Sequence, residues 1–423
     1  MATKFWTGNA KAIAQVAEVV FGTYDGTTTR RITIGGTYVE AADSGGTLTA
    51  ALAALAALLN ASEHPYFAAI TWSSTATKII GTADVEGVPF TFSASVSGGT
   101  GTVVTPYAIT TAPTGPNHWD NKFNWSDEAV PVSTDTVIFK SSSVNVCWGI
   151  DQNAVTLTKL VIEKSFTGRI GLNHAQFATT SDGATVSTPN VPEYRDHYLK
   201  ISATESQIGI AEGPGTLTGS DRIKINFGAA ANQVCTVWDS ASAGADEGYP
   251  AILILANHNT FKLYVRNAPG AVGVCKGASD ETSTMSEINI TADDESTSVY
   301  TGDGLTLTTW FQGGGDNVLR AAGTITTVSA YGGSLLIEGD YTITTLNVNG
   351  STVKDNHFKT GGNAVTTANF YEKGGSIDFS GSNVARTYAT TNLKQGAAMK
   401  FDKSIVTFTS IVQPDRMTVL SVA

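Results

Sequence analysis

The stretch TITTVSAYGGSLLIEGDYTITTLNVNGSTV, residues 324–353, contains the same short phrase twice. The phrase Ile-Thr-Thr begins at Ile325 and again at Ile343. Leu307 precedes the first phrase by the same interval, Val365 follows the second by a slightly longer one, and two threonines follow each of them. An apolar residue that returns at this interval predicts a repeating structural unit of about 20 residues.

A second motif lies between the Thr-Thr phrases, at 333–335, 350–352 and 375–377, and each copy begins with Gly-Ser. Each repeat therefore has room for two short strands. A parallel β-helix fits this pattern, because every coil must bury one face of each strand at a fixed phase. We expect Leu307, Ile325, Ile343 and Val365 to form stacked core rungs, with Thr326 and Thr344 in register outside.

Two other folds compete with the β-helix. A β-sandwich or jelly roll also has many short strands, although it does not require evenly phased Thr-Thr phrases. A calcium-binding solenoid would carry tandem Gly-Gly-x-Gly-x-Asp motifs, and QGGGDN at 312–317 is a single imperfect copy. The expected fold class is mainly β, with a small N-terminal α+β domain and an elongated, parallel β-helical body.

The composition supports a folded, β-rich protein. Charged residues make up 15% of the 423 residues, below the roughly 25% of typical soluble domains, whereas 41% are hydrophobic. The net charge of −11 argues against nucleic-acid binding, which needs clustered Lys and Arg. The first twenty residues have no continuous apolar run, so we expect neither a standard export signal nor membrane insertion.

Residues 1–112 are predicted to form the α+β docking domain. A hairpin is expected between the strand-like segments 18–26 and 29–41. The segment SGGTLTAALAALAALLNASEHP changes to helical periodicity, with Thr47 as N-cap and an apolar face made of Leu48, Leu52, Leu55, Leu58 and Leu59. Three β-like runs follow, and a Gly/Thr/Pro-rich linker is expected near residues 98–117.

The rest of the chain divides into three parts: a Trp-rich entry to the β stack at 113–175, an irregular β region with surface loops at 176–300, and the repeat-containing solenoid at 301–423. The entry contains Trp119-Asp and Asn-Trp125-Ser, then Val-Pro, then Asp-Thr-Val-Ile-Phe at 135–139, and then Leu-Thr-Lys-Leu-Val-Ile at 157–162. Trp119 and Trp125 are candidate caps of the stack, because large rings close the open end of a β core. A sugar-stacking platform, which would also involve Trp148 and Trp238, is the alternative.

This entry pattern resembles the start of β-helical stalks in large surface proteins. With the GTLTAALAALAALLNAS, PYFAAI and VPFTF segments in front of it, the order resembles a family of structural proteins of tailed-bacteriophage virions. The resemblance implies a homotrimeric virion-surface protein, assembled in the host cytoplasm, whose N-terminal domain binds other virion proteins. Capsid decoration or a short head fibre is the first placement and a tail fibre or spike is the second. A glycan of the host surface remains an open candidate partner.

No catalytic motif emerges from the residues, so no enzymatic activity and no cofactor are expected. A polysaccharide depolymerase on a β-helix, a further alternative, would be expected to place two carboxylates on strand positions one or two coils apart. The available acids, Asp239, Asp246, Glu247 and the group 293–295, have the sequence context of solvated turns. The patch PEYRDHYLK, with Glu193, Tyr194, Arg195 and His197, is interpreted as a polar corner. The histidines and the three cysteines lack metal-ligand spacing, and the cysteines are expected to be buried free thiols.

Overall fold

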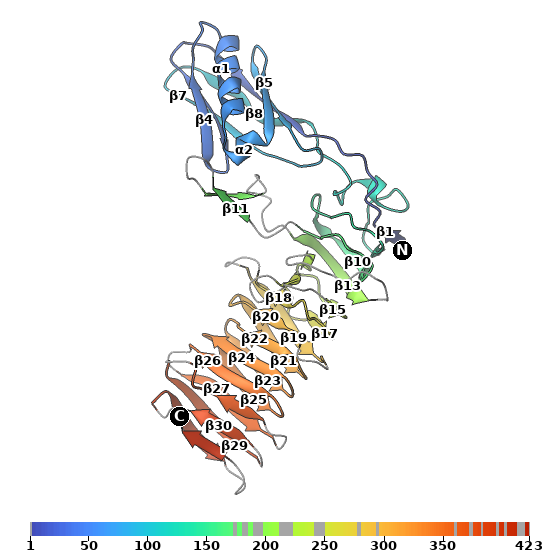
Figure 1. Ribbon diagram of the computed structural model, residues 1–423, viewed down its shortest axis with the longest axis vertical. Coiled ribbons are helices and arrows are strands. Elements are labelled where there is room, and N and C mark those ends of the chain that lie inside the picture. The colour runs from blue at the N-terminus through green and yellow to red at the C-terminus, as the bar shows by residue number, and fades with distance from the viewer. Residues whose placement is uncertain are drawn as a thin grey trace.

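Figure 1 shows the chain in a computed structural model, with a helix-containing unit at one end and a long stack of strands at the other. The structure describes residues 2–171, 176–179, 185–188, 198–210, 223–240, 250–276, 281–292, 296–358, 362–371, 375–381, 384–394, 397–401, 404–412 and 419–422. No helix among these residues is long and apolar enough to cross a membrane.

The elongated body consists of two parallel sheets, because each strand pairs with the second strand after it; the strand Leu199–Ile210 also pairs, through its first two residues, with the next strand. The first sheet contains β13 (Leu199–Ile210), β15 (Val234–Val237), β17 (Lys262–Val265), β19 (Ser283–Ile290), β21 (Leu305–Gln312), β23 (Thr324–Ala330), β25 (Thr342–Val348), β27 (Asn363–Phe370), β29 (Arg386–Leu393) and β31 (Val406–Val412). The second sheet contains β14 (Ile223–Asn226), β16 (Ile252–Leu255), β18 (Val272–Val274), β20 (Val299–Thr301), β22 (Asp316–Leu319), β24 (Ser334–Gly339), β26 (Thr352–His357), β28 (Ser376–Asp378), β30 (Ala398–Phe401) and β32 (Val419–Val422). Each coil thus contributes one strand to each sheet.

The register places equivalent apolar residues of successive coils on top of one another. Ile325 lies opposite Ile343, and Ile343 lies opposite Val365. These three side chains and Leu307 are at most 1% exposed. The predicted fold class, mainly β with an elongated β-helix-like body, is therefore confirmed, and the parallel pairing does not fit a β-sandwich or jelly roll.

The Thr-Thr phrase marks a bend in the strand. Side chains of a straight strand alternate between two faces, but Ile325 and Val328 are both buried while Thr326 and Thr327 between them are not. In β25, two residues that are not buried likewise separate Ile343 from the next buried residue, Leu346. Each long strand of the first sheet therefore turns a corner at its Thr-Thr pair and wraps part of the way around the core.

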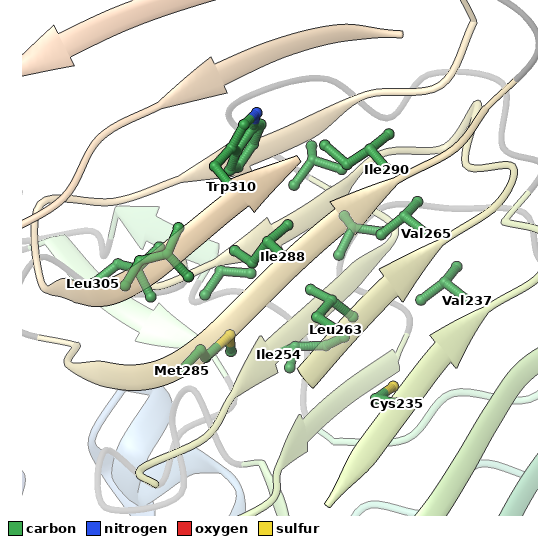
Figure 2. Close-up of a cluster of buried hydrophobic side chains, with 14 of the residues drawn as sticks. Cys235, Val237, Ile254, Leu263, Val265, Met285, Ile288, Ile290, Leu305 and Trp310 are labelled. Carbon is green, nitrogen blue, oxygen red and sulfur yellow. The ribbon is translucent and has the colours of Figure 1, made fainter. Parts of the chain in front are cut away.

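Figure 2 shows the core of the earlier coils, where side chains from successive strands lie in columns. Leu263 lies opposite Ile288, and Ile288 lies opposite Trp310. Val265 and Ile290 form a neighbouring column. Full burial of each such side chain contributes roughly 1.5–3 kcal/mol, so the stack is stabilised by repetition of one packing arrangement.

The stack begins well before residue 301. Strands β13 to β20 lie within the region expected to be irregular, and they pair in the same two sheets with longer connections between them. The first sheet also extends towards the N-terminus through β10 (Asp151–Glu163), β9 (Thr136–Phe139) and β1 (Thr3–Phe5). The first strand of the chain thus belongs to the body, although it lies within the residues 1–112 predicted to form the docking domain.

The α+β unit lies between β1 and β9 in the sequence. One antiparallel sheet has the order β5-β6-β2-β8 and the other has the order β4-β3-β7. Their bounds are β2 (Val16–Gly22), β3 (Thr29–Ile34), β4 (Thr37–Ala42), β5 (Ile70–Ser74), β6 (Lys78–Ala83), β7 (Ser93–Ser97) and β8 (Thr102–Thr111). Because β8 continues to Thr111, the connection to the body is shorter than the linker expected at 98–117.

The predicted helix is present as α1 (Leu48–Ala61), and a four-residue helix α2 (Pro65–Ala68) follows it. The Thr47 side chain accepts a hydrogen bond from the Ala50 N–H at 3.2 Å, as an N-cap does. The buried face contains Leu52, Leu55 and Leu59 and packs against the strands of the unit. The prediction was wrong for Leu58, which is 48% exposed.

The predicted hairpin between 18–26 and 29–41 is also wrong. Strand β3 pairs with β4 inside the second segment, and β2 pairs with β6 and β8 in the other sheet. The Asp25 carboxylate explains the difference, because it accepts hydrogen bonds from the backbone N–H groups of Thr27, Thr28 and Thr100. These bonds hold the pKa of Asp25 well below its usual range and join the turn after β2 to the turn before β8.

Two further short elements lie outside both sheets of the body. The 3₁₀ turn η1 (Lys122–Asn124) follows the Trp119 segment. Strands β11 (Gln176–Thr179) and β12 (Thr185–Thr188) form an antiparallel pair of their own.

Candidate functional site

An aromatic base cluster, defined as Trp6, Trp119, Trp125, Phe139 and Phe166, lies at the N-terminal end of the body core. The Trp119 and Trp125 rings meet edge to face at 4.7 Å, and Trp6 meets Trp125 in the same way at 5.1 Å. All five side chains are buried. The two candidate cap residues therefore lie together in this cluster, and Trp6 is a third member that the sequence pattern did not indicate.

Polar contacts hold the first strand in this base. The buried Lys4 ammonium donates to the Asp127 carboxylate at 2.6 Å and lies 3.9 Å from that of Asp135. The Trp6 indole N–H donates to the Val144 carbonyl at 3.0 Å. These contacts join the first strand to residues more than 120 positions later in the chain, at the base of the body.

Two chain segments connect the α+β unit to the base, and they bond to each other. Ile13 forms an antiparallel bridge with Thr114, and the Gly87 N–H donates to the Ile13 carbonyl at 3.1 Å. His118 Nε2 lies 2.7 Å from the Gly87 carbonyl oxygen, and its ring is buried. A connection made of two paired segments resists twisting and bending more than a single flexible linker does.

A buried polar cluster lies inside the last coils of the body, formed by Asp355, His357, Arg386, Tyr388 and Tyr341. His357 Nδ1 lies 2.9 Å from Asp355 Oδ1, and Arg386 Nη1 donates to the same oxygen at 3.1 Å. The Tyr388 hydroxyl donates to Asp355 Oδ2. Arg386 also donates to the backbone carbonyls of Asp355 and Phe379, so the cluster ties β26, β29 and the chain after β28 together.

The electrostatics of this cluster follow from its enclosure. Burial alone would raise the pKa of Asp355, but the charges and hydrogen bonds of His357, Arg386 and Tyr388 together hold it well below the usual range. Burial, reinforced by the negative charge of Asp355, raises the pKa values of Tyr388 and Tyr341 well above normal. At most 2% of any of these residues is exposed, so the cluster has the combination of groups of an acid–base site but no access for a substrate. The cluster therefore joins neighbouring coils through buried hydrogen bonds and an ion pair.

The outward surface of the first sheet carries regular polar columns. Thr309, Thr327, Thr345, Thr367 and Thr390 occupy one register position in five successive strands. Beside them, Ser329, Asn347, Asn369 and Asn392 form a second column, in which Ser329 is buried and the three asparagines are partly exposed. Asn347 donates to Ser329 at 3.2 Å, Asn369 to Asn347 at 2.9 Å and Asn392 to Asn369 at 2.7 Å.

Most of the acidic candidates lie outside the described residues: Asp246, Glu247, the group 293–295, and Glu193 with the rest of its patch, Tyr194, Arg195 and His197. Asp239 is described and forms an ion pair with Lys164 at 2.6 Å. Trp148 is buried, whereas Trp238 is 43% exposed and lies apart from the aromatic base cluster.

The three cysteines are free. Burial raises the pKa of Cys147 to about 11 and that of Cys275 to about 12, and it raises the pKa of the fully buried Cys235 further. These thiols are protonated, and therefore poor nucleophiles, at neutral pH. Among the residues that the structure describes, no group of three or more His, Cys, Asp or Glu side chains is placed to hold a metal ion.

The alternation of residues along β26 is a sequence signal for the buried polar cluster. Val353, Asp355 and His357 alternate along β26, so all three point to the face that Val353 buries. Because Asp355 and His357 are two and four residues after the core residue Val353, strand alternation predicts that both point into the core. The sequence offers no comparable signal for Arg386, whose partner Asp355 lies 31 residues away.

No protein-family model, curated protein or solved structure matches this chain.

Proposed function

We propose that this protein is a non-enzymatic structural component of a tailed-bacteriophage particle, located on the virion surface. The α+β unit docks on other virion proteins, and the parallel body projects from it. Capsid decoration or a short head fibre is the placement we favour, and a tail fibre or spike is the alternative. The protein assembles in the host cytoplasm as a homotrimer.

The observation that carries this proposal is the double connection between the two parts of the chain. Strand β1 pairs with β9 in the base of the body, and the segments that leave this base on either side of the α+β unit pair through Ile13 and Thr114. Such a connection transmits force from a rigid rod to a docking unit. A surface appendage of a particle needs this property, whereas a soluble enzyme has no need of it.

The chemistry of the described residues supports the non-enzymatic part of the proposal. Their strongest concentration of ionisable groups, around Asp355, is enclosed in the core and therefore stabilises coils instead of meeting a substrate. The columns of hydroxyl and amide groups outside the first sheet suit a surface that stays soluble while remaining regular.

Immunogold labelling of purified virions, followed by densitometry of the protein band, tests the proposal. We expect gold on intact particles, and tens to hundreds of copies per particle for capsid decoration. A handful of copies with label at the tail would favour the tail appendage. Absence of the protein from purified particles would contradict the proposal in both forms. Sedimentation tests the trimer separately, because it predicts a species of three times 44.1 kDa and no stable monomer.

A further inference from the structure

A second outward column runs beside the amide column of Ser329, Asn347, Asn369 and Asn392. It consists of Tyr331, Asn349, Tyr371 and Lys394, each following the last buried residue of its strand and each donating its backbone N–H to the previous coil. These four residues lie two positions beyond the amide column, just past the ends of β23, β25, β27 and β29, and all four are at least partly exposed, so the two columns lie side by side on the surface.

Aromatic rings lie in three of the five coils of this face. Tyr331 is 41% exposed and meets the Phe311 ring edge to face at 5.5 Å. Phe311 occupies the register position of the amide column in the preceding coil, opposite Ser329. Tyr371 is half-buried, and the Lys394 ammonium lies 5.2 Å from the centre of its ring. Rings of this kind offer an apolar surface beside hydrogen-bonding groups.

The spacing of the rings is set by the stack. Tyr331 and Tyr371 lie two coils apart, and two strand spacings correspond to about 9.5 Å along the body. An extended β-1,4-linked polysaccharide repeats its ring orientation at every second sugar, and the length of one sugar is close to one strand spacing. A straight glycan that lies along the body can therefore bring two sugars, separated by a third, opposite Tyr331 and Tyr371.

The polar groups and the charge of this face favour the same ligand. Asn349 lies between the two tyrosines and is partly exposed, although its Oδ1 is buried and accepts no hydrogen bond within the described part of the chain. From Phe311 to Lys394 the two columns contain no acidic residue and one basic residue, in a chain of net charge −11. A neutral face in an acidic protein suits a neutral chain of hydroxyl groups and does not suit a highly charged polymer.

We propose that the outer face formed by Phe311, Tyr331, Asn349 and Tyr371 binds a neutral, extended, β-1,4-linked polysaccharide parallel to the body axis. The two tyrosines stack on alternate sugars, and the amide column provides hydrogen bonds to the hydroxyl groups between them. This inference deepens the proposed function, on which it rests, by naming a ligand class for the exposed body, and it uses no residue of the docking unit.

Isothermal titration of the purified full-length protein with hexasaccharides tests the proposal. Cellohexaose, mannohexaose and chitohexaose serve as β-1,4-linked probes. Maltohexaose has α linkages that curve the chain, and an alginate hexamer has a charge on every sugar. We expect at least one β-1,4-linked probe to bind, and neither of the other two to bind comparably.

The variants identify the face. Tyr331→Ala and Tyr371→Ala should each weaken binding about tenfold, as expected for the loss of one aromatic contact. Tyr331→Phe should retain most of the affinity because it keeps the ring. Tyr38→Ala is the matched control, since Tyr38 is an exposed tyrosine of the α+β unit and its removal should leave binding unchanged.

Three results would overturn the inference: no β-1,4-linked probe binds at millimolar concentration, maltohexaose or the alginate hexamer binds equally well, or the tyrosine variants that retain the wild-type circular dichroism spectrum bind like the wild type. The titration uses isolated protein, whereas the proposed function is tested on virions. Failure of glycan binding therefore leaves the structural role standing, and absence from virions leaves the glycan result standing.

Discussion

Ile325 lies directly opposite Ile343 on neighbouring parallel strands, and both side chains are completely buried. The pair of Ile343 and Val365 repeats this arrangement in the next coil. We expect Ile343→Ala to lower the free energy of unfolding by about 2–5 kcal/mol, because it removes buried methyl groups and leaves a cavity. Thermal and urea unfolding measure the change.

Thr344→Ala is the control for this prediction, because Thr344 is the next residue of the strand and its side chain is exposed. Its effect should stay within about 0.5 kcal/mol. Equal losses in the two variants would show that Ile343 is not in the core.

Alanine substitutions at two glycines distinguish the cost of backbone strain from the cost of a steric clash with the previous coil. Gly333 and Gly323 both have positive φ angles, 68° and 74°. A Cβ on Gly333 would lie 2.1 Å from the Gly315 carbonyl oxygen of the previous coil, whereas a Cβ on Gly323 meets nothing within 4 Å. We expect Gly323→Ala to cost about 1 kcal/mol from strain alone and Gly333→Ala to cost clearly more, as measured by urea unfolding. Similar costs would contradict the close approach of the two coils.

Asp355 provides an acid-dependent test of the buried polar cluster. Asp355→Asn leaves Arg386 without its buried anionic partner, and breaking such a pair costs about 3–5 kcal/mol near neutral pH. Asp303→Asn is the control, because Asp303 is exposed and its replacement should change stability little.

The sign of the pH dependence follows from the lowered pKa of Asp355. A carboxyl group with a depressed folded pKa contributes its full stability above its unfolded pKa, about 3.9, and loses that contribution as the pH falls through the lower folded value. The stability difference between wild type and Asp355→Asn should therefore be constant above about pH 4 and shrink below it. A difference that shrinks between pH 8 and pH 5 would assign the effect to another group.

Trp6 tests whether the first strand is part of the body. Trp6→Ala should destabilise the base of the stack by about 3–5 kcal/mol, because the ring is 2% exposed and packs against Trp125. Hydrogen exchange should show faster exchange of backbone amides in β9 than in β25. Phe123→Ala is the control, since Phe123 is half exposed and its removal should leave β9 protected. Unchanged exchange of β9 in Trp6→Ala would place Trp6 outside the core.

The repeat was predictable from sequence because its information is local. The Ile-Thr-Thr phrases indicate that Ile325 and Ile343 point into the core, and their spacing gives the number of residues in one coil. The corner at Thr326 and Thr327 was less accessible, since two polar residues in a row can mark a bend or simply two solvent-facing positions.

Long-range pairings were not predictable in the same way. Nothing in the sequence near Lys4 indicates that this strand pairs with β9, where Lys4 lies opposite Val137. The turn at Asp25 was misassigned because its hydrogen bonds to Thr100 compete with the hairpin that its local sequence favours. The charge pair of Asp355 and Arg386 likewise depends on which coils are stacked, and only the three-dimensional structure provides that information.

Distances between spin labels along one outer column test the parallel stack most directly. A label at Thr308 is paired in turn with a label at Thr366 and at Thr409, all three being exposed positions that follow a residue packed in the core. The strands concerned, β21, β27 and β31, are three and five steps apart in the first sheet, so the backbone separations should be about 14 Å and about 24 Å. Distances that rise in this proportion would confirm one continuous stack, and a Thr409 distance equal to or shorter than the Thr366 distance would contradict it.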